Sequence, residues 1–352
     1  MIRFLSLLLA ALTAWTALPA AARSSWEGVA RVVVVGDLHG DYAKFHAVLS
    51  QASLIDATGA WSGGAAHLVQ LGDVPDRGAE TRRILDLMIR LERQARRAGG
   101  YVHALIGNHE AMNMEGDLRY TTPGEFAAFT DRKSPGRRDA YYRAVVAALT
   151  AKPPPAGLPV FDADHPLGWV EHRLAWSPTG AYGRWIATHN AVIRIDEVLY
   201  LHAGIGPAYL PFDAETMNTA VRTALMRKPQ APEAPPDILW HEAGPLWYRG
   251  LAQADEALEG QHLTAVLARH GVRRIVVGHT KRYPMVRSRF EGRMILTDVA
   301  PPDGCADPRG FLIKEGEAFV AVHRGQRLAL RPGEAYLAEI AALDRAAGCT
   351  TD

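Results

Sequence analysis

The amino-acid sequence predicts an α/β fold with a parallel sheet in its first half, because strand and helix patterns alternate from residue 31 onward. Residues 31–36 read RVVVVG, a β-branched run typical of a strand that is buried on both faces. The elements that follow are predicted by periodicity as a helix at 42–52, a strand at 67–71, a helix at 79–98 and a strand at 101–106. This βαβαβ order calls for parallel strands joined by right-handed crossovers.

The second half of the chain is less regular. Residues 112–175 hold helical fragments broken by prolines, and we expect them to form a cap insertion. Two strands are predicted at 186–195 and 198–202, joined by a tight turn. The later elements are predicted as a helix at 261–270, a strand at 273–277 and a second, antiparallel sheet built from short runs at 285–290, 293–297, 310–313 and 318–323.

The first 22 residues form a predicted export signal and not part of the fold. Arg3 precedes an apolar run at 4–18, and Ala20 to Ala22 offer an A-x-A cleavage site. A membrane anchor is the alternative, but the run is shorter than the roughly 20 residues that span a bilayer. We therefore expect an exported, periplasmic or secreted protein without stable membrane insertion, and a single domain over 23–352.

Composition and cysteine content limit the partners of this chain. It has 352 residues, of which 48% are hydrophobic and 22% charged, and a formal net charge of +1. That balance gives no reason to expect nucleic acid as a partner. Cys305 and Cys349 are the two cysteines. In an oxidising compartment an even pair predicts a disulfide, and two unrelated thiols are the alternative.

Five predicted strand ends carry a glycine together with side chains that bind metals or transfer protons. They are GDLHG at 36–40, GDVPDRG at 72–78, GNHE at 107–110, HAG at 202–204 and GHT at 278–280. Each motif taken alone has a structural alternative: a Gly-Asp pair after a strand usually forms a turn, and Asn108 could cap a helix. All five together predict one crevice, because the carboxyl ends of strands converge in α/β sheets. Carboxylate, amide and imidazole ligands suit Mn, Fe or Zn better than Mg or Ca alone.

These motifs, in this order, resemble those of the calcineurin-like metallophosphoesterase superfamily, specifically its phosphoprotein phosphatase branch. GPLWYR at 244–249 and GDLRY at 116–120 look most like the Shewanella-like protein phosphatases within that branch. The resemblance covers nearly the whole mature chain. It implies an α/β/β/α sandwich of two mixed sheets flanked by helices, with a helical cap. In one departure, Lys281 stands where many phosphodiesterases of the superfamily carry a second histidine.

The resemblance also implies a metal site and its ligands. Two divalent or trivalent ions, of Mn, Fe or Zn, would be bound side by side. The implied ligands are Asp37 and His39 at the first ion, Asp73 between both ions, and Asn108, His202 and His279 at the second.

Further residues receive catalytic roles by the same resemblance. His109, oriented by Asp76, would protonate the leaving oxygen, which agrees with the need of an alkoxide for a proton donor. The phosphate oxygens would be bound by Arg77, Arg249 and Asn108. Arginine forks suit this task because they form paired hydrogen bonds with phosphoryl oxygens.

We expect hydrolysis of phosphate monoesters, on a phosphorylated protein or a small molecule, by a hydroxide that bridges the two metal ions. A nucleotide or dinucleoside-polyphosphate hydrolase on the same core is an alternative function. A catalytically dead homologue that binds phosphate or protein is another, but such proteins usually lose a ligand. Every implied ligand is present in this chain.

Overall fold

The computed structural model describes residues 23–148, 157–228, 234–235, 237–299 and 310–349. The predicted signal at residues 1–22 lies outside this part, so export stays a prediction. Among the described residues, no helix has the length and apolar character needed to cross a bilayer.

One six-stranded sheet contains the predicted βαβαβ unit. Its strand order is β12-β11-β10-β2-β3-β4. The strands are β2 (Arg31–Val35), β3 (His67–Gln70), β4 (Tyr101–Ala104), β10 (Phe311–Glu315), β11 (Ala318–His323) and β12 (Gln326–Ala329). β2, β3 and β4 are parallel, which confirms the predicted parallel unit, and β10 to β12 extend the sheet in antiparallel pairs.

A second six-stranded sheet has the order β1-β5-β6-β7-β9-β8. The strands are β1 (Ser25–Trp26), β5 (Val192–Ile195), β6 (Val198–Leu201), β7 (Arg274–Val277), β8 (Arg287–Arg289) and β9 (Met294–Leu296). The sheet is mixed, since β6, β7 and β9 are parallel to one another, as are β1 and β5, whereas β5 runs antiparallel to β6 and β8 runs antiparallel to β9.

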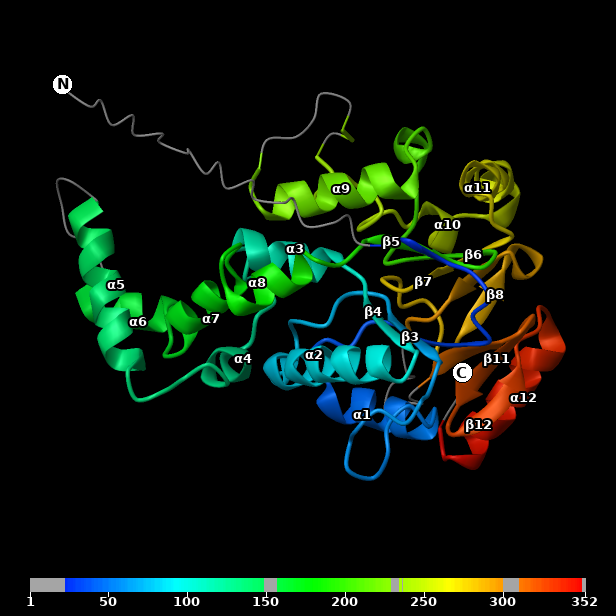
Figure 1. The fold of residues 1–352 in the computed structure, drawn as a ribbon, viewed down its shortest axis with the longest axis horizontal. Helices are drawn as coiled ribbons and strands as arrows, with labels where there is room; N and C mark the ends of the chain where they lie inside the picture. The colour runs from blue at the N-terminus through cyan, green and yellow to red at the C-terminus, as the bar shows by residue number, and fades with distance from the viewer. Residues whose placement is uncertain (1–22, 149–156, 229–233, 236, 300–309, 350–352) are drawn as a thin grey trace, which may run out of the picture.

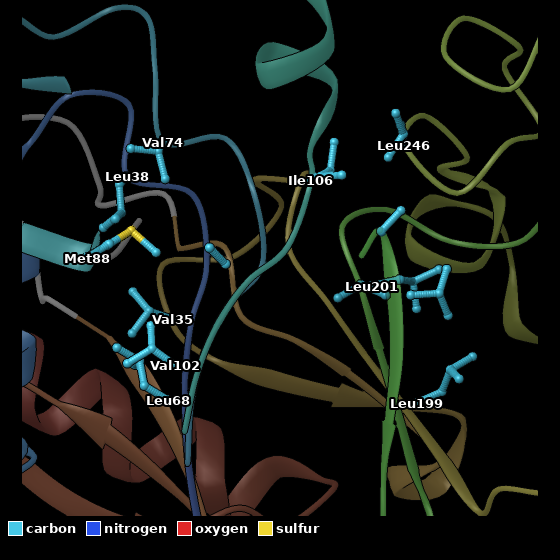
Figure 2. Close-up of a cluster of buried hydrophobic side chains, with 14 of the residues drawn as sticks. Val35, Leu38, Leu68, Val74, Met88, Val102, Ile106, Leu199, Leu201 and Leu246 are labelled. Atoms are coloured by element: carbon cyan, nitrogen blue, oxygen red, sulfur yellow. The ribbon is translucent and has the colours of Figure 1, made fainter. Parts of the chain in front are cut away.

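The core follows the alternation of side chains along the strands. Val32 and Val34 of β2 belong to a buried cluster that joins the two sheets, together with Val276 of the other sheet. Val33 and Val35 point the opposite way, into a cluster shared with the helices. Figure 2 shows Val35, Leu68 and Met88 within this second cluster. A strand buried on both faces explains the unbroken valine run.

Helices cover both outer faces, as Figure 1 shows. α1 (Tyr42–Gln51) and α2 (Thr81–Arg97) lie on one side. α9 (Ala214–Leu225), the short α10 (Gly250–Gln253) and α11 (Glu256–His270) lie on the other. α12 (Glu334–Ala346) precedes Cys349, which is disulfide-bonded. Cys305, the remaining cysteine of the sequence, lies outside the described residues, and the bond at Cys349 agrees with the predicted pair.

The predicted cap region is helical. It contains the end of α3 (Asn108–Glu115), α4 (Pro123–Ala127), α5 (Ser134–Ala148), α6 (Gly157–Asp164) and nearly all of α7 (Trp169–Trp176), and α8 (Ala181–Ile186) follows it. α5 and α6 stand away from the two sheets (Figure 1). The bounds of the cap and the single-domain assignment stay predictions.

Three sequence predictions are corrected. The four short runs near the C-terminus do not form one sheet, because β8 and β9 join β7 whereas β10 and β11 join β2. The strand predicted from residue 186 begins at Val192, because Ile186 closes α8 and accepts a turn hydrogen bond from the amide of His189. The helix predicted from 261 begins at Glu256, capped by Asp255.

Candidate active site

The predicted site residues lie where parallel strands of both sheets end. Asp37, Asp73 and Asn108 follow β2, β3 and β4, and His202 and His279 follow β6 and β7. The backbone leaves these strands sharply, so several non-glycine residues take a positive φ: His39 (48°), Asp73 (59°), Asp76 (74°), Arg77 (65°) and His279 (62°). Such strained conformations gather at functional sites.

One group of donor atoms surrounds His202. Its Nε2 lies 2.9 Å from Asn108 Oδ1, 3.0 Å from His279 Nδ1 and 3.3 Å from Asp73 Oδ1. Its Nδ1 lies 2.8 Å from the carbonyl oxygen of Leu71, to which the ring donates. In the neutral ring Nε2 is then an acceptor that faces other acceptors, an arrangement that a shared cation satisfies in place of a proton. These four residues fit one metal ion.

A second group lies on the other side of Asp73. His39 Nε2 is 3.6 Å from Asp37 Oδ2 and 3.9 Å from Asp73 Oδ2. His39 Nδ1 is 3.1 Å from the carbonyl oxygen of Pro75, which orients the ring in the same way as at His202. Asp73 thus directs Oδ1 to one group and Oδ2 to the other. The spacing also places His109 Nε2 3.7 Å from Asp73 Oδ2.

The charges of the site favour cations. Burial would raise the pKa of Asp73, but His202 and His109 hold that pKa well below its usual range. Burial would lower the pKa of His202, but the Asp73 carboxylate, with Asp37, raises it to about 9. Burial, with the His202 charge, lowers the pKa of His279 to about 3. Neutral imidazole is the form that binds metals.

His109 and Asp76 form a buried pair. His109 Nδ1 lies 2.5 Å from Asp76 Oδ2. Burial would lower the pKa of His109, but the charges of Asp73 and Asp76 outweigh it and raise the pKa above its ordinary value. Asp76 Oδ1 accepts hydrogen bonds from Asn113 Nδ2 (3.1 Å) and Thr121 Oγ1 (2.9 Å). The geometry favours the protonated form of an imidazole that lies beside the predicted metal ligands.

The two arginines contact different members of the predicted ligand set. Arg77 Nη1 donates to His39 Nε2 at 2.5 Å, and its Nη2 lies 3.4 Å from His109 Nε2. Arg77 would have to withdraw for His39 Nε2 to bind a metal ion. Arg249, at the start of α10, donates from Nη1 to the carbonyl oxygen of His279 at 2.9 Å. Beside Arg249 lies a cavity of about 550 Å³, lined by His241, Glu242, Ala243, Trp247, Tyr248 and Arg249.

Glu110 has a positioning role that the sequence analysis did not assign. Its carboxylate accepts the backbone amides of Gly107 (2.8 Å), Asp73 (2.9 Å) and Val74 (2.8 Å). It thereby ties the loop after β3 to the start of α3. Gly107 has no room for a side chain, since a Cβ there would lie 2.4 Å from Asp73 Oδ1. Glu110 stands three residues after the N-cap Gly107 and accepts its amide, as the glutamate of a capping box does, although glycine supplies no side-chain acceptor in return.

Asn113 and Thr121 were also not predicted. Asn113 lies one helical turn after His109, a spacing that places both side chains on one face of α3. Thr121 carries no such signal, because it reaches Asp76 from a loop beyond α3. All ten predicted site residues belong to one connected set of contacts around Asp73.

Comparison with known proteins agrees with this geometry. Residues 30–283 match the calcineurin-like phosphoesterase family. An uncharacterized protein of Schizosaccharomyces pombe is 31% identical over 307 residues, which cover 84% of this chain and 81% of the relative. Shewanella-like protein phosphatase 2 of Arabidopsis thaliana is 29% identical over 300 residues, which cover 81% of this chain and 75% of the relative.

A solved structure is similar in fold as well. The crystal structure of a cold-active protein-tyrosine phosphatase from a psychrophilic Shewanella species has a TM-score of 0.66 and 28% identity, covering 88% of this chain and 82% of that chain. The predicted sandwich of two mixed sheets flanked by helices is confirmed. The chain therefore belongs to the calcineurin-like phosphoesterase family and is a metal-dependent phosphoester hydrolase with Shewanella-like protein phosphatases among its relatives.

Proposed function

We propose that this protein hydrolyses phosphate monoesters, including those on proteins, at a centre of two metal ions. The proposed ligands are Asp37, His39, Asp73, Asn108, His202 and His279. The observation that carries the proposal is the division of the Asp73 oxygens, with Oδ1 3.3 Å from His202 Nε2 and Oδ2 3.9 Å from His39 Nε2. A carboxylate placed in this way can bridge two ions.

The side chains around the centre have separate tasks. When bound, two such ions supply an activated water molecule at neutral pH and positive charge against the phosphoryl oxygens. His109 holds a proton for the leaving oxygen, and Asp76 fixes the ring and stabilises its charged form. Arg77 and Arg249 bind the phosphoryl oxygens. The cavity beside Arg249 has room for the rest of the substrate.

The arginines favour monoesters over diesters. A monoester dianion carries one more negative charge than a diester, so two guanidinium groups stabilise its binding and transition state more strongly. Lys281 adds a third positive charge after His279. The names of the relatives, protein phosphatases and a protein-tyrosine phosphatase, support a phosphorylated protein as substrate.

The test compares substrates on metal-reconstituted protein. We expect p-nitrophenyl phosphate and phosphopeptides to be hydrolysed with a much higher kcat/KM than bis-p-nitrophenyl phosphate, and a chelator to abolish both activities. Comparable values for monoester and diester would contradict the proposed substrate class. Full activity of metal-free protein would contradict the metal centre itself. Phosphotyrosine and phosphoserine peptides of equal sequence then distinguish the two protein substrates.

A further inference from the structure

The structure places one further carboxylate beside the first group of metal ligands. Asp298 follows β9, at the end of the strand that neighbours β7 in its sheet. β2 of the other sheet ends at the same point. A Cβ added at Gly36 would lie 2.9 Å from the carbonyl oxygen of Thr297 and 3.1 Å from Cα of Asp298. The two sheets therefore meet in backbone contact immediately before Asp37 and Asp298.

Asp298 is buried without hydrogen-bond donors. Its exposed fraction is 2%, and among the described residues no donor reaches either carboxylate oxygen. Its side chain lies against the carboxyl group of Asp37, which is itself buried and accepts the backbone amide of His279 at 2.9 Å. The positive charges of Lys281 and Lys44 also act on Asp298.

Two adjacent buried carboxyl groups need either a proton or a cation between them. An unpaired buried charge costs several kcal/mol, and a second like charge adds to that cost. A neutral Asp298 that donates a hydrogen bond to Asp37 is one solution. A metal ion that both carboxylates approach is the other, and Asp37 already belongs to the proposed ligand set. The second solution gives the Asp298 carboxylate the positive partner that the described residues do not provide as a hydrogen-bond donor.

We propose that Asp298 is an additional ligand of the first metal ion, beside Asp37, binding it directly or through a coordinated water molecule. This inference rests on the proposed dinuclear centre. It adds a carboxylate to a ligand group for which His279-Thr280-Lys281 offers no second histidine. A carboxylate there strengthens binding of a doubly or triply charged ion.

The test measures metal binding and needs no substrate. Metal-free full-length protein is titrated with Mn²⁺, and free Mn²⁺ is counted by electron paramagnetic resonance. For Asp298→Asn we expect one of two sites to lose affinity by about 10- to 100-fold, the range seen when residues that support metal ligands are changed. The other site should keep its affinity, because its ligands around His202 are untouched.

Two further variants keep the outcome decisive. Asparagine can donate a hydrogen bond to Asp37, so wild-type Mn²⁺ affinity in Asp298→Asn together with a loss in Asp298→Ala would show a neutral donor and overturn the proposal. Asp344→Asn changes another buried carboxylate, with 1% exposure, on α12 and should bind two Mn²⁺ ions normally. A wild-type protein that binds fewer than two Mn²⁺ ions would instead contradict the proposed dinuclear centre.

Discussion

Replacing Asp76 by asparagine is the sharpest test of proton donation by His109. In the native site, Asp76 Oδ1 accepts from both Asn113 and Thr121, and Oδ2 faces His109 Nδ1 at 2.5 Å. The asparagine oxygen will stay with its two donors. The new amide group then points at His109 Nδ1, and its N–H donates to that nitrogen. A charged imidazole carries a proton on Nδ1, so its N–H would face the N–H of the asparagine, and the charged form is therefore destabilised.

The size of the expected change in the pKa of His109 follows from the loss of the Asp76 charge. A carboxylate within hydrogen-bonding distance shifts the pKa of a partner by about 1–3 units, and each unit corresponds to about 1.4 kcal/mol. In the native protein the pKa of His109 is raised, so the ring holds its proton until the pH rises through that value. In Asp76→Asn burial still lowers this pKa, and the proton is lost at a pH about 1–3 units lower.

The assay is the pH dependence of kcat for two kinds of leaving group. At pH 7, kcat of Asp76→Asn for alkyl phosphates should fall by on the order of 10²–10⁴, the usual contribution of general acid catalysis. p-Nitrophenyl phosphate should lose much less, because its leaving phenoxide needs little protonation. His109→Asn should behave alike, and the double variant should be no worse than either, since the two residues act as a unit. Equal losses for both substrates would refute the assignment.

Three further changes test the metal bridge, the loop geometry and the disulfide. Asp73→Asn should lower the metal content measured by plasma emission spectrometry more than any other single ligand change, because it removes the only oxygen pair shared by both ligand groups in the described part of the chain. Glu110→Gln should lower the free energy of unfolding in urea by about 2–4 kcal/mol at pH 8, since one backbone amide loses its acceptor. Burial and the charge of Asp73 raise the pKa of Glu110 to about 7, so the native carboxylate is ionised there. Cys349→Ser should lower the free energy of unfolding by about 4 kcal/mol, the value that the chain-entropy relation gives for a disulfide closing a loop of about 45 residues. A thiol-labelling assay on denatured, unreduced protein checks the pairing, which is supported if Cys305 and Cys349 both stay unmodified.

The sequence predicts those parts of the fold that depend on local periodicity. The valines of β2 alternate between two buried faces, so an unbroken β-branched run identifies the strand without reference to its neighbours. The assignment of β8 to β11 to sheets could not be made in this way. A run of alternating residues shows that a strand exists, whereas its neighbour is chosen by contacts between segments far apart, such as β10 with β2.

The site residues also fall into those that local sequence patterns predict and those that depend on tertiary contacts. Asp37, Asp73, His109 and His279 stand directly after predicted strands, and strand ends converge whatever the later packing. The supporting residues depend on tertiary contacts. Thr121 reaches Asp76 from a loop whose course is set by helices that no strand pattern predicts. Glu110 is intermediate between these two kinds of residue. Its position in the first turn of α3 can be predicted from the sequence, whereas its hydrogen bonds to the two backbone amides after β3 cannot.

Asp298 shows how sheet packing can add to a site that motifs describe. It lies in a segment without a recognisable motif, and its approach to Asp37 requires two sheets to touch at Gly36 and Thr297. A side chain larger than hydrogen at residue 36 would separate these strand ends, since its Cβ would lie within 3.1 Å of three backbone atoms. Gly36, which begins the first motif, therefore does more than permit the turn after β2, because it also allows the two strand ends to approach each other. It lets β9, far from β2 in the sequence, bring a carboxylate to Asp37, the first of the proposed metal ligands.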